Sequence, residues 1–264
     1  MSMELIMQSV PVFLLIFCRI TSFFVVAPVF SSKGVPMQFK VGISFFISMI
    51  IFLTYGTNQT VPQDMTYILL IISEILVGLL LGFVGYLLIT AIQTAGAFID
   101  IQIGFGIANV LDPMSGASIP MLGNFKYMIA MLLFLSMNGH LHLIDAIVHS
   151  YNWIPLSNDL FLKLFSGSIS EFLIRTFSQS FVLAFQMSAP LVVAMFLTDV
   201  GLGFLARTAP QFNIFVIGVP LKIFLGLAML MLLIPSFSYV FGNLFEILFD
   251  SMNNLLGIIG NQPN

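Results

Sequence analysis

Charged residues are scarce in this sequence. Only 7% of its 264 residues are charged, comprising eight basic and eleven acidic side chains. Soluble domains typically carry about a quarter of charged residues, so the composition excludes an ordinary soluble domain and indicates a membrane protein. The basic residues are scattered along the chain and form no patch, which excludes a nucleic-acid-binding protein.

Residues that could form a reactive centre are also few. Cys18 is the only cysteine, so no intramolecular disulfide can form. The three histidines have no partners at metal-ligand spacing, and the sequence contains no HExxH motif, serine elbow or phosphate-binding glycine loop. We therefore expect no catalytic residue, no metal site, no cofactor and no enzymatic activity.

Apolar runs make up most of the chain. Hydrophobic residues account for 59% of it, phenylalanine alone contributes 29 residues, and the mean hydropathy is +1.09. We expect helices over residues 10–30, 41–55, 66–99, 127–136, 160–177, 181–199, 214–234 and 237–260. The first run lacks a preceding basic region and a following small-residue cleavage site, so we expect it to be a retained membrane span.

Two of these runs have unusual lengths. Residues 41–55 are short for a simple membrane crossing. Residues 66–99 would form a helix about 51 Å long, well beyond a hydrocarbon core of about 30 Å. We therefore expect the long run to bend, to fold into a hairpin or to project out of the membrane.

Two charges lie inside predicted spans. Arg19 interrupts the first run and Glu74 interrupts the run 66–99. An ionisable side chain at membrane depth is costly and normally faces a partner or an aqueous cavity. For Arg19 the alternatives are a carboxylate elsewhere in the same chain, snorkelling to the interface, or a water-filled cavity. Close to Glu74, the spacing of Gly78 and Gly82 is typical of helix–helix contact.

The stretch 101–125 differs from the rest of the chain because glycine and proline interrupt it. Irregular backbone at membrane depth is tolerated only where protein covers it or where it lines a cavity. This stretch is therefore either a packed connection or a pore constriction, in which apolar side chains exclude water and ions while glycines act as hinges. The candidate plug residues are Gly104, Gly106, Leu111, Asp112, Pro113, Met114, Gly116, Ile119, Pro120 and Met121.

The C-terminal half predicts a helical hairpin. Its arms are residues 181–199 and 214–234, joined by residues 201–211. We expect charged and polar side chains at the hairpin tip to dock a neighbouring protein, and an ordinary transmembrane hairpin with its charges among the lipid headgroups is the alternative. The residues concerned are Asp199, Arg207, Asn213 and Lys222.

Four phrases of this sequence resemble a known family. They are PVFSSKGVPMQFKVG (28–42), DPMSGASIPMLGNF (112–125), LLFLSMNGHLHLI (132–144) and APLVVAMFLTDVGLGFLARTAPQFNIFVIGVPLK (189–222). Together they resemble the FliR family of flagellar biosynthetic proteins, the R/T-type subunits of the type III secretion export gate. The resemblance covers about residues 10–240 in order. The residues of the matching segments favour the flagellar branch over the related virulence-secretion branch.

The resemblance implies an all-α fold of bent and membrane-spanning helices, in which a P-type subunit is fused to a Q-type helical hairpin. Residues 1–177 would be the P-like part, with the plug at 106–122, and residues 178–264 the Q-like hairpin and C-terminal helix. It also implies an inner-membrane channel for unfolded flagellar proteins within the basal body. The implied partners are P-type and Q-type subunits, together with the B-type and A-type export-apparatus proteins.

Other classes of membrane protein remain as alternatives. A solute transporter would need a polar site at mid-depth and an internal repeat, whereas the charges here are dispersed. A passive scaffold for other subunits is harder to separate from a gate subunit, because a gate subunit also organises its neighbours.

Overall fold

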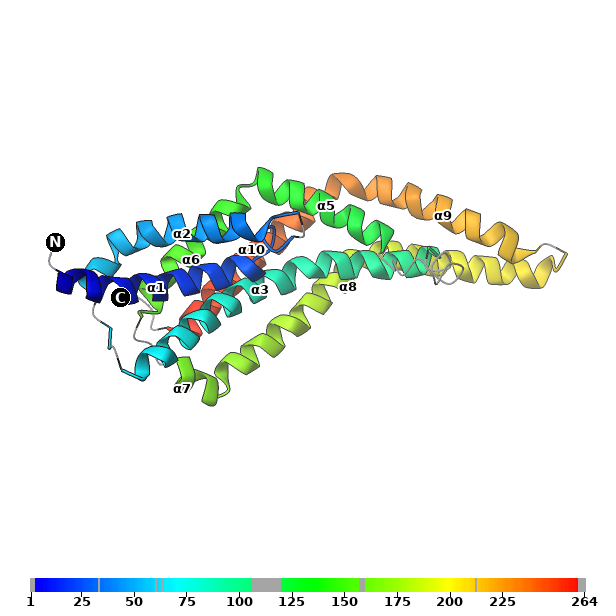
Figure 1. Ribbon diagram of the computed structural model, residues 1–264. Coiled ribbons are helices and arrows are strands. Elements are labelled where there is room, and N and C mark those ends of the chain that lie inside the picture. The colour runs from blue at the N-terminus through cyan, green and yellow to red at the C-terminus, as the bar shows by residue number, and fades with distance from the viewer. Residues whose placement is uncertain are drawn as a thin grey trace, which may run out of the picture. The chain divides into compact units, whose positions relative to one another are not determined.

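The computed structural model describes residues 3–32, 34–59, 61–62, 64–105, 120–156, 160–211 and 213–260, which contain helices and turns and no strand (Figure 1). The helices are α1 (Met3–Val26), α2 (Met37–Thr54), η1 (Gly56–Asn58), α3 (Thr66–Ile103), α5 (Met121–Ser136), α6 (Gly139–Trp153), α7 (Leu160–Phe165), α8 (Ser168–Thr208), α9 (Ile214–Leu233), η3 (Ile234–Ser236) and α10 (Phe237–Ile259). The expected all-α fold is confirmed.

Among the described residues, five helical segments are long and apolar enough to cross a membrane, or up to six if α5 and α6 together form one broken span. The five are Ser9–Val26, Met37–Thr54, Thr66–Ile103, Ser168–Thr208 and Val216–Ile259. The expectation of a multi-pass membrane protein is therefore confirmed.

Prolines set two helix boundaries that differ from those predicted from the apolar runs. Helix α1 ends at Val26 rather than at residue 30, because Ala27 precedes Pro28 and a residue in that position is disfavoured in a helix. Helix α2 begins directly after Pro36 and has 18 residues, about 27 Å. The run 41–55 was therefore predicted too short, and α2 comes close to the thickness of a hydrocarbon core.

Helix α3 is one uninterrupted helix of 38 residues, about 57 Å long. The hairpin alternative for this run is therefore wrong. The helix continues past the predicted end at residue 99, because the first residue that closes it is Gly104, whose φ of 101° favours glycine.

The predicted hairpin is present, but its turn is shorter than expected. Helix α8 runs without a break from Ser168 to Thr208, and α9 begins at Ile214. The glycines at 201 and 203, which were expected in the turn, lie inside α8, since an isolated glycine costs a helix only about 1 kcal/mol. The helix ends two residues before Pro210, which disfavours helical backbone at Ala209, although Pro190 is accommodated inside the same helix.

The described residues form two compact units that interleave along the chain. Unit 1 comprises Met1–Leu88, Asn138–Phe177 and Glu246–Asn264, whereas unit 2 comprises Ile89–Met137 and Ser178–Phe245. These units describe packing. The division into P-like residues 1–177 and Q-like residues 178–264 concerns likeness to other subunits and stays a prediction.

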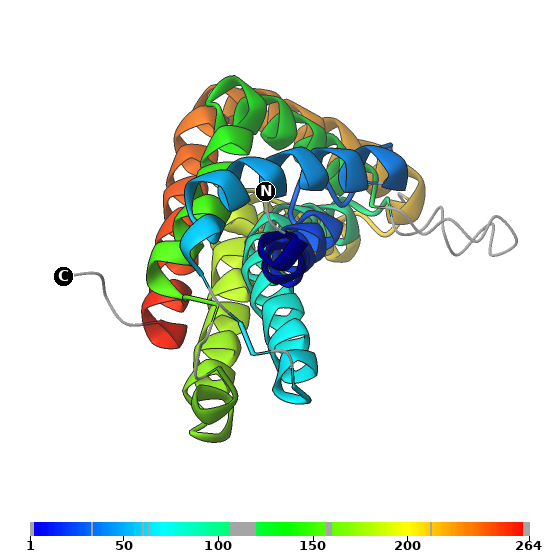
Figure 2. The same ribbon diagram turned by 60° about the vertical axis from the view of Figure 1, so that its left-hand side comes forward.

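In unit 1, helix α1 packs between α2 and the first half of α3. Helix α2 lies beside α1 (Figures 1 and 2), with the Phe13 ring 5.6 Å from Phe45 and 6.0 Å from Phe52. On the α3 side, a Cβ added to Gly78 would overlap the Arg19 carbonyl, and one added to Gly82 would lie 3.0 Å from the Phe23 carbonyl oxygen. The glycine spacing therefore serves close helix packing, as predicted.

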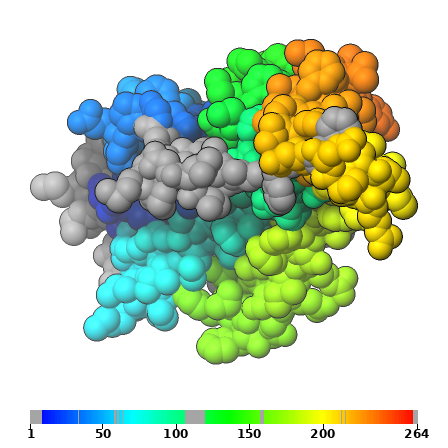
Figure 3. All heavy atoms as spheres, turned by 90° about the vertical axis from the view of Figure 1, so that its right-hand side faces the viewer, coloured from blue at the N-terminus to red at the C-terminus, as the bar shows by residue number. Residues whose placement is uncertain are grey.

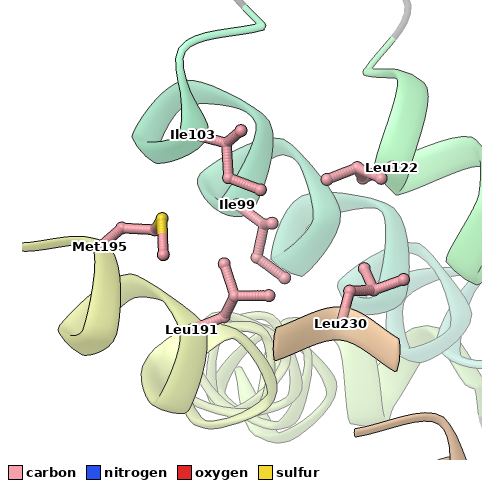
Figure 4. Close-up of a cluster of buried hydrophobic side chains, with 6 residues drawn as sticks. All are labelled: Ile99, Ile103, Leu122, Leu191, Met195 and Leu230. Carbon is pink, nitrogen blue, oxygen red and sulfur yellow. The ribbon is translucent and has the colours of Figure 1, made fainter. Parts of the chain in front are cut away.

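Unit 2 has its own apolar core. Side chains from four helices point toward one another in it (Figure 4). They are Ile99 and Ile103 from α3, Leu122 from α5, Leu191 and Met195 from α8, and Leu230 from α9. This cluster fastens the last turns of α3 to the start of α5 and to both arms of the hairpin.

Candidate functional site

The central stretch that the sequence singles out is described only at its two ends. Residues Gly106, Leu111, Asp112, Pro113, Met114, Gly116 and Ile119 lie outside the described residues. The ends are residues 96–105, at the close of α3, and residues 120–124, at the beginning of α5. We call these two ends together the loop base.

Asp100 joins the two halves of the loop base. Its carboxylate oxygens accept hydrogen bonds from the Leu122 backbone N–H, at 3.1 Å, and from the Gly123 N–H, at 3.4 Å. The first turn of a helix has no internal partners for its N–H groups, and its end of the helix dipole is positive. A buried carboxylate, only 5% exposed, therefore both caps α5 and attaches it to α3.

The backbone of Asp100 closes α3 at the same point. Its carbonyl oxygen accepts hydrogen bonds from the N–H groups of Gly104, at 3.2 Å, and Phe105, at 3.0 Å. One residue thus terminates α3 with its main chain and initiates α5 with its side chain. Gly104 lies at the helix end, where the sequence predicted a break.

The two helices touch through their backbones at the loop base. A Cβ added to Gly96 would overlap the backbone of Gly123, and one added to Gly123 would lie 3.0 Å from the Gln93 carbonyl oxygen. At Gly96 this helix approach requires glycine, whereas at Gly123 an added Cβ would make a tight contact.

Helix α5 begins earlier than the sequence predicted. Its first residue is Met121, directly after Pro120, rather than residue 127. Met121 and Leu122, the last two residues of the predicted plug interval 106–122, therefore lie in the first turn of α5, and the plug role of the interval stays a prediction. Met121 is 68% exposed, whereas Leu122 is buried in the core of unit 2.

A polar contact also links the loop base to the hairpin. Gln102, in the last turn of α3, donates a hydrogen bond to the Asp199 carboxylate at 3.2 Å. The Lys222 ammonium group lies 2.8 Å from the same carboxylate and pairs the two hairpin arms. The end of α3 is thus bound to both α8 and α9 by this contact as well as by the apolar core.

The placement of Asp199 and Lys222 at the hairpin tip is therefore wrong. Because α8 continues to Thr208, Asp199 lies about 13 Å before its end. Arg207 and Asn213, both exposed, do flank the turn. Figure 3 shows the two arms side by side at this end, with α8 in yellow and α9 in orange.

In unit 1, the two charges inside the spans form a buried ion pair. Arg19 Nε lies 2.6 Å from Glu74 Oε2, and its Nη2 lies 2.8 Å from Oε1. The guanidinium group also donates to Ser150 Oγ at 3.1 Å and to the Ile154 carbonyl at 3.0 Å, and it lies 4.2 Å from the centre of the Tyr151 ring. Both charged side chains are fully buried. Of the alternatives for Arg19, the carboxylate of the same chain is correct.

This ion pair joins α1, α3 and α6 within unit 1. Protein groups provide all the contacts described above for the guanidinium. The cluster therefore stabilises the packing of the helices and is not a reactive site. Within the described ranges, no group of three or more His, Cys, Asp or Glu side chains could hold a metal ion.

Sequence reasoning missed Asp100, Gln102 and the Gly96–Gly123 contact. Asp100 was visible as the first charge after the run 66–99, and an acid at the end of an apolar run is a signal worth examining. Its partners lie more than twenty residues away on another helix, and no local pattern indicates a cap over that distance.

Comparison with known proteins finds similarity along almost the whole chain. Residues 10–248 match the family described as bacterial export proteins, family 1. The chain is 42% identical over 258 residues to the flagellar biosynthetic protein FliR of Bacillus subtilis, covering 98% of this chain and 99% of that protein. It is 31% identical over 241 residues to FliR of Escherichia coli, covering 90% and 91% respectively. It is 32% identical over 224 residues to the Yop proteins translocation protein T of Yersinia pestis, covering 83% and 84%.

Proposed function

The chain belongs to the bacterial export proteins, family 1, and we propose from this that it is a core subunit of the flagellar type III protein export gate. The resemblance noted in the sequence to the FliR family is thereby confirmed. This is a family of export-apparatus subunits and not of enzymes, so the protein is not an enzyme.

The observation that carries the flagellar assignment is the 42% identity to a FliR protein across 98% of the chain. The FliR protein of Escherichia coli and the Yop translocation protein are about equally similar to this chain, at 31% and 32% identity, and the first covers 90% of the chain against 83% for the second. The second candidate is an R/T-type subunit of a virulence secretion system, which the Yop similarity supports. A solute transporter has no comparable support.

The proposed role of the central stretch is to plug the channel. The loop base supports this role because Asp100 and the Gly96–Gly123 contact hold the two ends of residues 106–119 together. A segment held in this way can move aside while the helices that carry it stay in place. Apolar residues such as Leu111 and Met114 would then exclude ions from a narrow constriction without using charge.

The proposed partners are P-type and Q-type subunits, with the B-type and A-type export-apparatus proteins nearby, in the inner membrane within the basal body. Large exposed apolar side chains support such a covered setting, since Phe46 is 69% exposed, Phe165 88% and Phe224 70%. The hairpin tip, with Arg207 and Asn213, is the proposed docking point for a Q-type subunit.

A deletion in the bacterium that makes this protein tests the flagellar role. We expect the deletion strain to lack external filaments and to stop secreting filament protein, and we expect the intact gene to restore both. A deletion strain that keeps its filaments and instead stops secreting virulence proteins would identify the second candidate.

A further inference from the structure

Helices α3 and α5 form a groove that carries four polar side chains beside the loop base, within unit 2. The groove has a volume of about 280 Å³. Its lining residues are Thr90, Gln93, Thr94, Ala97, Pro120, Gly123 and Asn124.

The side chains of this groove contrast with the helix that carries them. Helix α3 is apolar, with a mean hydropathy of 2.6 over its most apolar window, yet two hydroxyls and two primary amides gather here without any charge. Thr94 Oγ1 donates to the Thr90 carbonyl at 3.2 Å and is satisfied within its own helix.

The two amides, by contrast, are exposed and unpaired. Gln93 and Asn124 both lie at the surface, and neither side chain makes a hydrogen bond to any part of the chain that the structure describes. An amide without a partner costs several kcal/mol, on the order of 2–7, in a purely apolar medium. Contact of this face with lipid chains is therefore unfavourable, whereas contact with water or a polar ligand is favourable.

The shape of the groove limits what can occupy it. Three of its lining residues, Ala97, Pro120 and Gly123, have little side-chain bulk, and the two helices approach closely at Gly123. A volume of about 280 Å³ lies just below the range for small-ligand sites, which is roughly 300–1,000 Å³. Such a groove accommodates a few residues of extended chain and no folded domain.

The chemistry of the groove matches a polypeptide main chain. Every residue except proline carries one N–H donor and one C=O acceptor, whatever its side chain. Each primary amide offers both donors and an acceptor. None of the lining residues is charged, so the groove has no ion-pair partner that would select a charged side chain.

We propose that this groove contacts the main chain of the unfolded polypeptide as it passes the loop base. The proposal rests on the proposed export function, because that function supplies an unfolded chain as the ligand. The groove shares Pro120 and Gly123 with the loop base, so an occupant would lie next to the point where residues 106–119 leave α3 and rejoin α5.

Site-specific photo-crosslinking in the assembled gate tests the proposal. A photoreactive residue replaces Gln93 or Asn124, and an exported protein fused to a tightly folded domain is arrested in transit. Matched controls carry the photoreactive residue at Ile101 and Met128, which are 71% and 59% exposed on the same two helices. We expect adducts with the arrested protein at Gln93 and Asn124, at least several-fold above the controls and only when the arrested protein is present.

Two substitutions provide a second measurement. Gln93→Leu and Asn124→Leu together keep the side-chain size and remove the amides. We expect the doubly substituted chain to assemble normally and the rate of export to fall several-fold. Normal export by an assembled double variant would overturn the proposal.

The identity of the adducts separates the possible failures. Adducts with another gate subunit that form whether or not a protein is arrested would make the groove a subunit interface and overturn the proposal. Adducts with lipid would overturn it as well. An arrested protein captured at Met121 but not at Gln93 or Asn124 would overturn the groove assignment while leaving the export function intact. Failure of the export function itself would appear separately, as secretion unchanged by deletion of the gene.

Discussion

At the scale of single residues, two carboxylates stabilise this protein in different ways. Glu74 neutralises a buried guanidinium group inside unit 1, whereas Asp100 accepts backbone hydrogen bonds at the loop base of unit 2. Both are almost completely buried. A buried charge is costly without partners, so in both cases the loss of one group leaves the other unsatisfied.

The buried ion pair leads us to predict that Glu74→Gln destabilises the protein. The substitution leaves the Arg19 charge buried without its counter-ion, which typically costs about 3–5 kcal/mol. We expect the level of the protein in membranes to fall sharply and its resistance to protease to be lost. Glu171→Gln is the matched control, because the Glu171–Arg175 pair is 66% and 77% exposed and such pairs contribute about 0–1 kcal/mol. Equal levels of the two variants would contradict the prediction.

Asp100→Ala should loosen the start of α5. The substitution leaves the N–H groups of Leu122 and Gly123 without acceptors in a buried site, at a cost of about 1–3 kcal/mol. We expect hydrogen exchange of these two amides to accelerate by roughly ten-fold or more. Asp145→Ala, which removes a carboxylate that is 64% exposed, is the control and should leave both rates unchanged.

At the scale of elements, proline and glycine set the helix ends, and the apolar runs did not. Pro36, Pro120 and Pro210 each stand at a boundary that hydropathy placed several residues away. Gly104 ends α3, whereas the glycines at 201 and 203 lie inside α8. The glycines differ because Gly104 has a φ of 101°, whereas a helix tolerates single glycines in its interior. Proline does not end every helix of this chain, since Pro11, Pro190 and Pro220 lie inside α1, α8 and α9.

The plug role proposed for the segment between the two ends of the loop base can be tested by replacing that segment. Replacing residues 107–118 with a short glycine–serine linker leaves Asp100, Gly104 and Pro120 in place. We expect the gate to assemble and the membrane to become leaky to ions and small solutes, because the apolar constriction is lost.

Solute entry into cells measures the leak, and the gate recovered from the same cells measures assembly. A control with the linker in place of residues 57–62, between α2 and α3, should stay tight. If the central replacement prevents assembly and no leak appears, the stretch is a packed connection. If it assembles and remains tight, the plug role is wrong.

At the scale of the whole molecule, exposed apolar surface dominates. Side chains such as Phe46, Ile174 and Leu232 are 69%, 69% and 76% exposed, and they come from three different helices. Lipid covers part of such a surface, and we expect neighbouring subunits to cover the rest.

We therefore expect the chain to depend on its partners. Expressed alone in mild detergent it should aggregate or be degraded, and co-expression with P-type and Q-type subunits should yield a stable complex. Size-exclusion chromatography distinguishes the outcomes. A well-behaved monomer obtained without any partner would contradict the expectation.

Composition and local pattern were sufficient for several conclusions. The scarcity of charge determined the membrane class, the long apolar runs determined that the chain is helical, and the four matching phrases determined the family. The hairpin of α8 and α9 was also predictable, as was the packing role of Gly78 and Gly82. Each of these depends on residues that are close in sequence or on the chain as a whole, so no knowledge of the fold is needed.

Contacts between distant residues required the tertiary structure. The choice of Glu74 as the partner of Arg19 and the position of Asp199 and Lys222 along the hairpin arms depend on which helices pack together. The same holds for Asp100, which sequence reasoning passed over and which caps a helix more than twenty residues away. Only folding brings these groups within hydrogen-bonding distance, because a hydrogen bond forms over about 3 Å and carries no signature in a sequence where its partners lie far apart.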